Sequence, residues 1–329
     1  MLSDQLKIAP DSVERAARTL RAGGLVAFPT ETVYGLGADA ENVDAVERVF
    51  AVKGRPSTHP LIVHLSGAHQ LPDWVEEVPD AAHRIAERFW PGPVTLVLRR
   101  ARRVPLAVTG RLETVALRVP DHPVALALLT AFGGGVAAPS ANRFGSVSPT
   151  TASHVREGLG SDVDYVLDGG SCAVGVESTI VDLTGEPAIL RPGGVSREDL
   201  EHVLGGSVPV RAKSSVRVPG QLPSHYAPRA RVLLVEPGQV LGLAEHLRAQ
   251  GCRVGVLVPP EFAGDAGSGA GQRVIVVPDS HARHARQLYE FLRDFDRHGC
   301  EVIVASVPVP DGLGLAITDR LRRAAGPRG

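Results

Sequence analysis

Residues 28–65 read FPTETVYGLGADAENVDAVERVFAVKGRPSTHPLIVHL. An apolar run begins at Leu25, just before this stretch, and stops at Pro29. A polar loop that contains Gly35 and Gly37 follows. A helical segment then ends in KGRP (53–56), and a second apolar run starts at Leu61. The pattern predicts a strand, a loop, a helix and a strand. Together they deliver hydroxyls, a phenol, two cations and a histidine to one small region. This set suits an anionic substrate paired with an amine-bearing one.

Length and composition set broad limits on the protein. A chain of 329 residues with 43% hydrophobic and 22% charged residues favours two globular domains. The net charge of −1 predicts no polyanion partner from bulk charge, so binding of nucleic acid needs a local patch. No signal peptide or membrane-spanning run is expected. The three cysteines show neither metal-ligand spacing nor a disulfide framework, which predicts a cytoplasmic protein and no metal-binding residues.

Two residue types are rare enough to draw attention. Of the 35 lysines and arginines only Lys7, Lys53 and Lys213 are lysines, and the only asparagines are Asn42 and Asn142. An ammonium is a compact point charge, whereas a guanidinium is a planar fork, so the two differ in what they bind. Because nearly every cationic residue of this chain is an arginine, the lysine at position 53 indicates a functional role for that residue. The alternative is that lysine occurs there by chance.

Residues 1–206 are expected to form one α/β domain with a mixed, twisted sheet, because strands and helices alternate without a strict βαβ order. The predicted helices are 10–22, 44–53, 81–89 and 123–132. The predicted strands are 25–28, 61–65, 94–98, 114–119, 136–138, 163–167, 178–183 and 188–191.

Composition changes near residue 206. Residues 207–230 are rich in proline, serine and basic residues and show no periodicity, which predicts an ordered linker or lid loop. A different rhythm occupies 231–329, which is expected to be a smaller Rossmann-like parallel α/β domain. Its predicted strands are 231–235, 253–258, 273–277 and 301–307, and its helices lie near 239–249, 281–297 and 315–325.

Most motifs have a structural interpretation beside a functional one. Lys53 followed by Gly54 could be a plain helix end with a favourable cation, and His64 could be a buried core histidine. Arg118 is different, because an arginine between apolar strand residues needs an anion partner or an exit to solvent. The run 140–142, SAN, is either a turn or a loop of donors facing phosphate. Residues 312–314, GLG, match only half of a dinucleotide fingerprint.

Taken together, five segments resemble the threonylcarbamoyl-AMP synthases of the YrdC type. These segments begin at Pro29 (PTETVYGL), Lys53 (KGRP), Pro139 (PSAN), Glu177 (ESTI) and Arg191 (RPG). The resemblance spans 10–205, and the later SHYAP (224–228) and GLGLA (312–316) resemble the longer, two-domain branch. It implies a reaction in which L-threonine, bicarbonate and ATP give threonylcarbamoyl-AMP and pyrophosphate, with Mg²⁺ as the expected metal. The product would feed a threonylcarbamoyl transferase complex that modifies tRNA.

The resemblance also implies roles for individual residues. Lys53 and Arg55 would be catalytic, by stabilising charge on the phosphates, and the Arg118 fork would hold the carboxylate of threonine. His59 stands where the family pattern has asparagine. The residues implied for ATP are Lys53, Arg55, His59, Thr114, Ser140, Asn142, Ser148, Arg191 and, from the linker, Tyr226. Those implied for L-threonine are Thr32, His64, Arg118, Ala138, Ser178 and Thr179.

Two alternatives share this fold. The first is a non-catalytic RNA-binding module, which an aromatic content of 4% and the lack of a stacking platform disfavour. The second is a carbamoyl-transfer maturation enzyme, which would need zinc-finger and acylphosphatase-like regions that this sequence does not show. ATP consumption with and without threonine and bicarbonate separates these alternatives from the synthase.

Overall fold

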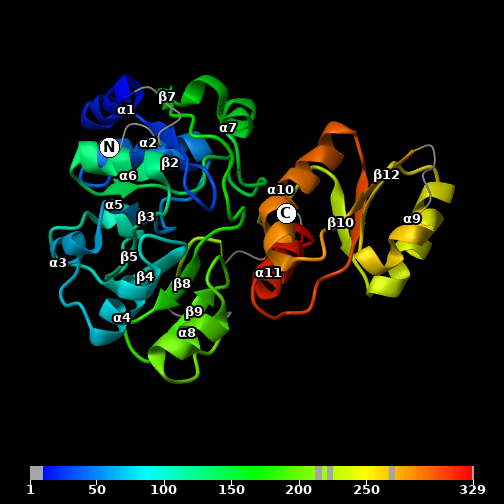
Figure 1. Ribbon diagram of the computed structural model, residues 1–329. Helices are drawn as coiled ribbons and strands as arrows, with labels where there is room; N and C mark the ends of the chain where they lie inside the picture. Colours follow the sequence, from blue (N-terminus) through cyan, green and yellow to red (C-terminus); the bar gives the residue numbers. More distant parts are fainter. Residues whose placement is uncertain (1–9, 212–216, 221–224, 267–270, 328–329) are drawn as a thin grey trace. The chain divides into compact units, whose positions relative to one another are not determined.

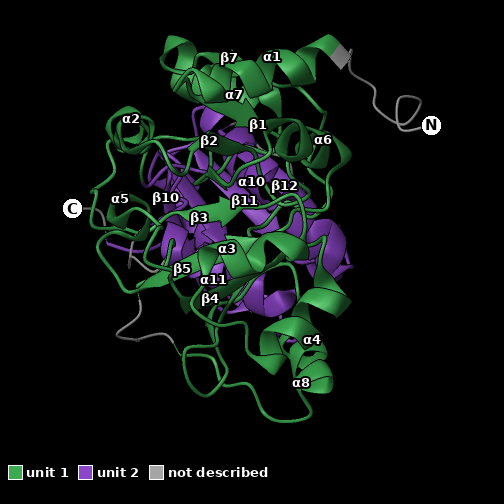
Figure 2. Ribbon diagram, turned by 90° about the vertical axis from the view of Figure 1, so that its left-hand side faces the viewer, with its two compact units in different colours: residues 1–144, 148–221 green, residues 145–147, 222–329 purple. Residues whose placement is uncertain are grey.

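The structure is a computed structural model and describes residues 10–211, 217–220, 225–266 and 271–327. Two compact units divide the chain (Figures 1 and 2): unit 1 comprises 1–144 and 148–221, and unit 2 comprises 145–147 and 222–329. None of the helices in the described part combines the length and apolar character that a membrane crossing needs.

Unit 1 is built on a nine-stranded mixed sheet in the order β7-β1-β2-β6-β3-β5-β4-β8-β9. The sheet contains parallel pairs, such as β3 with β5, and antiparallel pairs, such as β4 with β5, which confirms the predicted mixed sheet. The strands are β1 (Val26–Phe28), β2 (Gly35–Asp39), β3 (Ile62–His64), β4 (Val94–Arg99), β5 (Thr114–Arg118), β6 (Val136–Ala137), β7 (Tyr165–Val166), β8 (Thr179–Asp182) and β9 (Ala188–Arg191).

The predicted helices of unit 1 are present, together with short ones that the sequence analysis did not predict. The helices are α1 (Pro10–Arg21), α2 (Val43–Lys53), α3 (Leu71–Trp74), α4 (Asp80–Phe89), α5 (Leu106–Thr109), α6 (Pro123–Phe132), α7 (Ala152–Leu159) and α8 (Arg197–Leu204). Helices α3 and α5 have four residues each, and α7 and α8 have eight, so an apolar period of 3.6 had few turns in which to show.

The prediction of a loop over Gly35 and Gly37 was wrong, because both residues belong to β2. A Cβ atom at Gly37 would lie 2.8 Å from a Val136 methyl and 2.9 Å from the Phe28 ring. Glycine is therefore required by a close approach within the sheet and does not mark a turn here. The polar residues of the motif occupy the link from β1 to β2.

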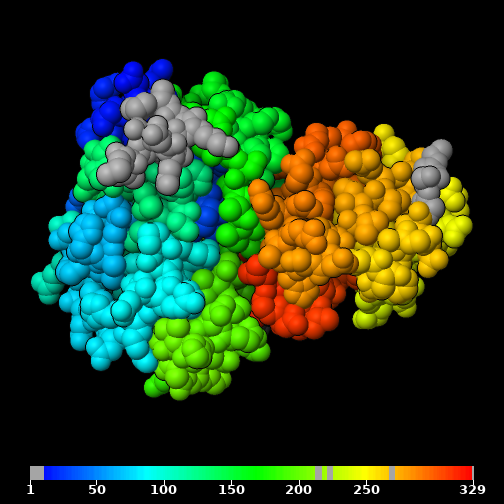
Figure 3. Space-filling view, in the orientation of Figure 1, coloured from blue at the N-terminus to red at the C-terminus, as the bar shows by residue number. Residues whose placement is uncertain are grey.

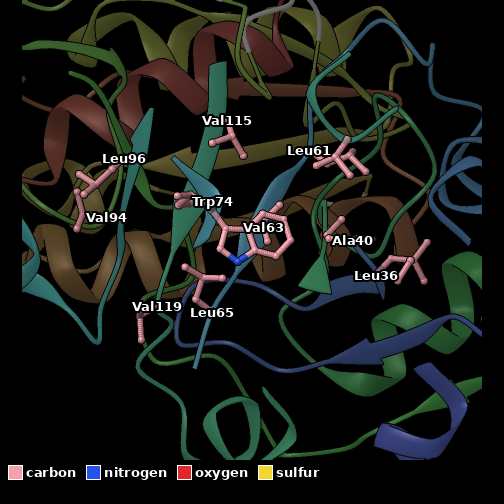
Figure 4. Packing of buried hydrophobic residues seen from close by; sticks show 14 of the residues in the cluster. Leu36, Ala40, Leu61, Val63, Leu65, Trp74, Val94, Leu96, Val115 and Val119 are labelled. Atoms are coloured by element: carbon pink, nitrogen blue, oxygen red, sulfur yellow. The ribbon is translucent and has the colours of Figure 1, made fainter. Parts of the chain in front are cut away.

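The two faces of this sheet bury different side chains. One face packs Val63, Val115 and Leu117 against Trp74 and the helices around it (Figure 4). On the other face, α1 and α6 cover the β1 side of the sheet. Farther along that second face a small cluster contains Ile62, Val97, Ala116, Ile180, Leu190 and Val218.

Unit 2 contains a four-stranded parallel sheet in the order β10-β13-β11-β12. Its strands are β10 (Arg231–Leu234), β11 (Val254–Val258), β12 (Gln272–Val276) and β13 (Val302–Ala305), and its helices are α9 (Val240–Ala249), α10 (His281–Arg297) and α11 (Gly314–Ala324). Helices α10 (orange) and α11 (red) lie side by side (Figures 1 and 3). The predicted parallel α/β architecture is confirmed for this part of the chain.

Candidate functional site

Lys53 is the last residue of α2 and is buried, with 3% of its surface exposed. The helix is fixed at both ends, because Asn42 caps its start and Gly54 ends it in the left-handed conformation, with φ of 63°. The Lys53 ammonium donates hydrogen bonds of 2.5 Å to the backbone carbonyls of Ser140 and Asn142. The lysine therefore joins the end of α2 to the loop that follows β6.

The Lys53 ammonium has only neutral carbonyl oxygens as hydrogen-bond partners, and its buried position disfavours the charged form. Burial lowers the pKa of Lys53 well below its ordinary value, and the positive charges of Arg55 and Arg143 lower it further. An oxyanion beside the ammonium would supply the missing countercharge and raise this pKa again. The site thus has the electrostatic character of a phosphate-binding position.

Arg55 and His59 extend this position around one aromatic ring. The Arg55 guanidinium lies 5.8 Å from the centre of the Phe144 ring and donates to the carbonyl of Pro60 at 3.0 Å. The His59 ring meets the edge of Phe144, with 5.7 Å between ring centres. Burial lowers the pKa of His59, and Arg55 lowers it further, so the imidazole is neutral at pH 7. We refer to Lys53 and Arg55 as the cationic cluster, beside which His59 is a neutral donor.

Arg118 has the anion partner that its sequence position demanded. Its Nη2 lies 2.6 Å from a carboxylate oxygen of Glu31, although the N–H is not aligned for a hydrogen bond. Nη1 donates to the Thr32 hydroxyl at 2.9 Å and Nε donates to the carbonyl of Gly92 at 3.2 Å. Arg118 and Glu31 are only 3% and 5% exposed, so this is a buried ion pair.

His64 lies directly across from Arg118, because the two residues are partners in the register of β3 and β5. The imidazole meets the edge of the Phe28 ring, with 5.8 Å between ring centres. Burial lowers the pKa of His64 to about 3, with a further contribution from Arg118. His64 is therefore a neutral hydrogen-bonding group beside a buried charge, and its Nδ1 has no hydrogen-bond partner within the described residues.

Arg191 and Ser178 form the next group along the sheet. Arg191 donates to the carbonyl of Ser178 from Nε at 3.1 Å and from Nη2 at 2.9 Å, and to its hydroxyl at 3.0 Å. A further bond of 3.1 Å runs from Nη1 to the carbonyl of Pro219. The Ser178 hydroxyl also lies 2.8 Å from the hydroxyl of Thr95 on β4. This network presents hydroxyls and one guanidinium at the start of β8.

Thr179 uses its hydroxyl differently from Ser178. Its Oγ1 donates to the backbone carbonyl of Val195 at 2.6 Å and accepts from the amide of the same residue at 3.0 Å. The Thr179 hydroxyl thus binds the segment after β9 to the first residue of β8. Of the two adjacent candidates, only Ser178 joins the arginine network.

Strand alternation puts several candidates on one face of the sheet. Side chains two positions apart in a strand share a face. His64 is two residues from Ile62, and both Thr114 and Arg118 are two residues from Ala116; these two apolar residues belong to the small cluster on the second face. Ala138 also packs on this side of the sheet, and its amide donates to the carbonyl of Ile62 at 2.8 Å.

Ser148 and the 140–142 loop complete the group in unit 1. The Ser148 hydroxyl, fully buried, donates to Glu177 at 2.7 Å. The Asn142 side chain donates to the carbonyl of Arg143 at 2.7 Å, so this segment is a turn as well as a source of donors. The Lys53 hydrogen bonds thus link the cationic cluster to the 140–142 loop, while the sheet face carries His64 and Arg118.

Tyr226 lies in unit 2, where its ring is packed among other side chains. It is 1% exposed, stacks on Tyr289 with 5.8 Å between ring centres, and lies under the Arg320 guanidinium at 5.0 Å. Its φ of 59° is in the left-handed region. The remaining parts of the predicted linker at 212–216 and 221–224 lie outside the described residues.

Three polar side chains in this region were not selected from the sequence: Glu31, Thr95 and Glu177. Glu31 and Glu177 stand inside the quoted motifs PTET and EST, so the signal was present but no role was attached to it. Thr95 interrupts an apolar strand, which is the same kind of signal that identified Arg118. All three are buried or nearly so and contact a candidate residue directly.

A protein-family model described as "Telomere recombination" matches residues 18–193, more than half of the chain. The chain belongs to the Sua5/YciO/YrdC family. A second model, described as "Threonylcarbamoyl-AMP synthase, C-terminal domain", matches residues 195–326 of this family member. The resemblance drawn from the five motifs and the two later segments is thereby confirmed.

Named relatives of this Sua5-family chain cover nearly its whole length. It is 42% identical to the threonylcarbamoyl-AMP synthase of Pyrococcus abyssi, over 95% of this chain and 94% of the relative. It is 41% identical to the enzyme of that name from Bacillus subtilis, over 99% and 96% of the two chains. The crystal structure of P. abyssi Sua5 complexed with L-threonine superposes with a TM-score of 0.90, covering 97% of this chain and 95% of that one.

Proposed function

We propose that this chain is an L-threonylcarbamoyladenylate synthase, which joins L-threonine, bicarbonate and ATP into threonylcarbamoyl-AMP and releases pyrophosphate. The observation that carries the proposal is the cationic cluster around Lys53, a buried ammonium held by carbonyl oxygens in the same unit as the buried Arg118–Glu31 pair. Relatives of this name at 41–42% identity over the full chain, and the L-threonine complex of one of them, support it.

The threonine end of the proposed site is centred on Arg118. A threonine zwitterion brings one carboxylate and one ammonium, and the Arg118–Glu31 pair offers one group of each opposite charge. The carboxylate would take a fork of Arg118, and the amine would approach Glu31 as it loses its proton. The other residues proposed for L-threonine are Thr32, His64, Ala138 through its backbone, Ser178 and Thr179.

The nucleotide end is centred on Lys53 and Arg55, which would stabilise the negative charge that builds on the phosphates during reaction. His59, as a neutral imidazole, can donate one hydrogen bond to a phosphate or to the base. The other residues proposed for ATP are Thr114, Ser140, Asn142, Ser148, Arg191 and, from unit 2, Tyr226.

The proposed chemistry needs two steps. The threonine amine and bicarbonate combine into a carbamate with loss of water, and a carbamate oxygen then attacks the α-phosphorus of ATP as the bond to pyrophosphate breaks. This second step makes the enzyme a nucleotidyltransferase. It proceeds by positioning and by electrostatic stabilisation, so the reaction requires no covalent enzyme nucleophile. We further propose that the product passes to an enzyme that transfers the threonylcarbamoyl group to tRNA.

Mg²⁺ is expected with the phosphates of ATP. Among the described residues no group of three histidine, cysteine or carboxylate side chains converges to hold a metal ion. Mg²⁺ is commonly bound through substrate phosphates and water with few protein ligands. We propose that the ion arrives with the nucleotide.

Pyrophosphate release by the purified full-length protein, measured with ATP, bicarbonate and L-threonine, tests the proposal. Release should depend on threonine and on bicarbonate. Lys53→Met should abolish it and lower the stability by only about 1–3 kcal/mol, because two buried carbonyls lose their donor while an apolar chain of similar length fills the space; the variant should therefore still unfold cooperatively. Arg102→Ala, on an exposed loop, is the matched control and should keep full activity. Unchanged turnover of Lys53→Met would reject the assignment, and salt-sensitive RNA binding without turnover would favour the RNA-binding alternative.

A further inference from the structure

Unit 2 contains a pocket of about 610 Å³ at one edge of its parallel sheet. Lining residues follow the carboxyl ends of the strands: Pro237 follows β10, Pro259 follows β11, Val277 follows β12 and Ser306 follows β13. Ligands of open parallel α/β sheets bind outside this edge. The volume also lies within the range of roughly 300–1,000 Å³ that is typical of small-molecule sites.

The strand order puts this pocket at a point where the chain changes direction. After β11 the chain moves outward to β12 at the sheet edge, and then returns to β13, which lies between β10 and β11. From β13 it continues to α11, which contacts β10. The loops after the neighbouring strands β11 and β13 thus lead in opposite directions, and both line the pocket. Such a switch point is the usual place for a ligand crevice in this class of sheet.

Two helices begin beside the pocket. Helix α10 starts at His281, and its N-cap residue Ser280 makes no side-chain capping bond, so the first-turn amides keep donor capacity. Helix α11 starts at Gly314, where an added Cβ would lie 1.9 Å from the Val309 carbonyl oxygen and 2.9 Å from the His281 ring. Glycine is needed for this close approach. Gly314 of the GLG segment therefore packs closely against two residues that line the pocket, Val309 and His281.

His284 is an independent sign of a ligand. It lines the pocket, is only 4% exposed, and its Nε2 has no hydrogen-bond partner among the described residues. Burial lowers the pKa of His284 to about 4, so the ring is neutral at pH 7 and its nitrogens can donate and accept. A buried polar atom without a partner is destabilising, and a bound molecule that reaches Nε2 would remove that penalty.

The lining restricts the chemistry of that molecule. Most of the wall is apolar and proline-rich, which suits the face of a planar ring. The exposed carboxylates of Glu261 and Asp279 also line the pocket, where they would repel a phosphate and accept hydrogen bonds from hydroxyls. Among the described residues no cluster of three metal-ligating side chains is present. A ring that both donates and accepts, attached to a diol, satisfies all of these features.

We propose that this pocket binds a nucleoside, with its base between the proline-rich wall and His284 and its ribose hydroxyls at Glu261 and Asp279. The amides at the start of α10 would donate to acceptor atoms of the base. Every lining residue belongs to unit 2, so this site is separate from the catalytic residues proposed in unit 1.

The test uses the full-length protein labelled with ¹³C and ¹⁵N in its histidine rings, titrated with adenosine and followed by NMR. His281 and His284 report on the pocket, whereas His59 and His64 report on the proposed site in unit 1. Saturable shifts of the His284 signals are expected. Loss of one hydrogen bond in His284→Phe should weaken adenosine binding at this site, followed on His281, by about tenfold. His246→Phe, on the exposed side of α9, should leave that affinity unchanged.

A ligand-side comparison keeps the test decisive if His284→Phe fails to fold. With the parent protein, 2′,3′-dideoxyadenosine should shift the His284 signals with about tenfold weaker affinity than adenosine, since it lacks the diol. Adenosine shifts confined to His59 and His64 would overturn the proposal. So would His284 shifts caused by inorganic pyrophosphate or MgCl₂ when adenosine causes none, because the pocket would then be an anion or metal site.

Discussion

Replacing Arg118 with methionine should destabilise unit 1 by about 3–5 kcal/mol, because it leaves the carboxylate of Glu31 buried without its cation. Both side chains of the pair are nearly inaccessible, so water cannot take over the role of the lost guanidinium. The same substitution also removes the donors to the Thr32 hydroxyl at 2.9 Å and to the Gly92 carbonyl at 3.2 Å.

A second substitution separates the charge effect from these hydrogen bonds. In Arg118→Met combined with Glu31→Gln the buried charge is gone, and only the bonds to Thr32 and Gly92 are missing, which should cost about 1–3 kcal/mol. Glu31→Gln alone should likewise cost about 3–5 kcal/mol, because it leaves the Arg118 guanidinium buried without its anion. The cycle therefore predicts a coupling energy of about 2 kcal/mol or more between the two residues.

Urea unfolding followed by tryptophan fluorescence measures these values for the right part of the chain. Both tryptophans, Trp74 and Trp90, belong to unit 1, so unfolding of unit 2 does not contribute to the signal. A double variant as unstable as Arg118→Met, or a coupling energy near zero, would refute the view that the ion pair is a buried and mutually compensating unit.

Three further outcomes test other parts of the structure. Thr179→Val should destabilise unit 1 by about 1–3 kcal/mol in urea unfolding, because its buried hydroxyl bonds to both the carbonyl and the amide of Val195. The pKa of His64 is about 3 in the folded state, below its ordinary value of 6.5, so between these pH values only the unfolded state binds the proton. The free energy of unfolding should therefore fall by about 1.4 kcal/mol per pH unit as the pH drops below 6.5, and His64→Phe should remove this contribution. Gly37→Ala should cost about 1–3 kcal/mol in thermal or urea unfolding through its clash with the Phe28 ring, whereas Gly185→Ala, with open space around it, should be tolerated.

The elements of both units could be predicted where the apolar period extended over enough residues. Helix α10 has 17 residues and matched its predicted range. The four-residue helices could not be predicted, because they form through their tertiary surroundings. Strand β2 was missed for a related reason. Its glycines read as turn residues in the sequence, and only the neighbouring Phe28 ring and Val136 explain why glycine is needed inside a strand.

The candidate residues were predictable as a set but not in their orientation. Ser178 and Thr179 are adjacent and chemically alike, and a shift of one residue in a strand exchanges the two faces of a sheet. In the structure the Ser178 hydroxyl accepts a hydrogen bond from Arg191, whereas the Thr179 hydroxyl donates to the backbone carbonyl of Val195. Likewise, the sequence indicated that Arg118 needs an anion, but not that Glu31, from a loop 87 positions earlier, provides it.

The electrostatic difference between the two ends of the proposed site follows from these partners. At one end Lys53 adds a buried positive charge that its two carbonyl partners do not cancel, which favours a ligand with net negative charge such as a triphosphate. At the other end Arg118 is already balanced by Glu31, so a net anion would gain little, whereas a zwitterion can exchange each charge of the pair for one of its own. The proposed pair of ATP and an amino acid matches this distribution of charge, and an assignment of two phosphate-bearing ligands to the same residues would not.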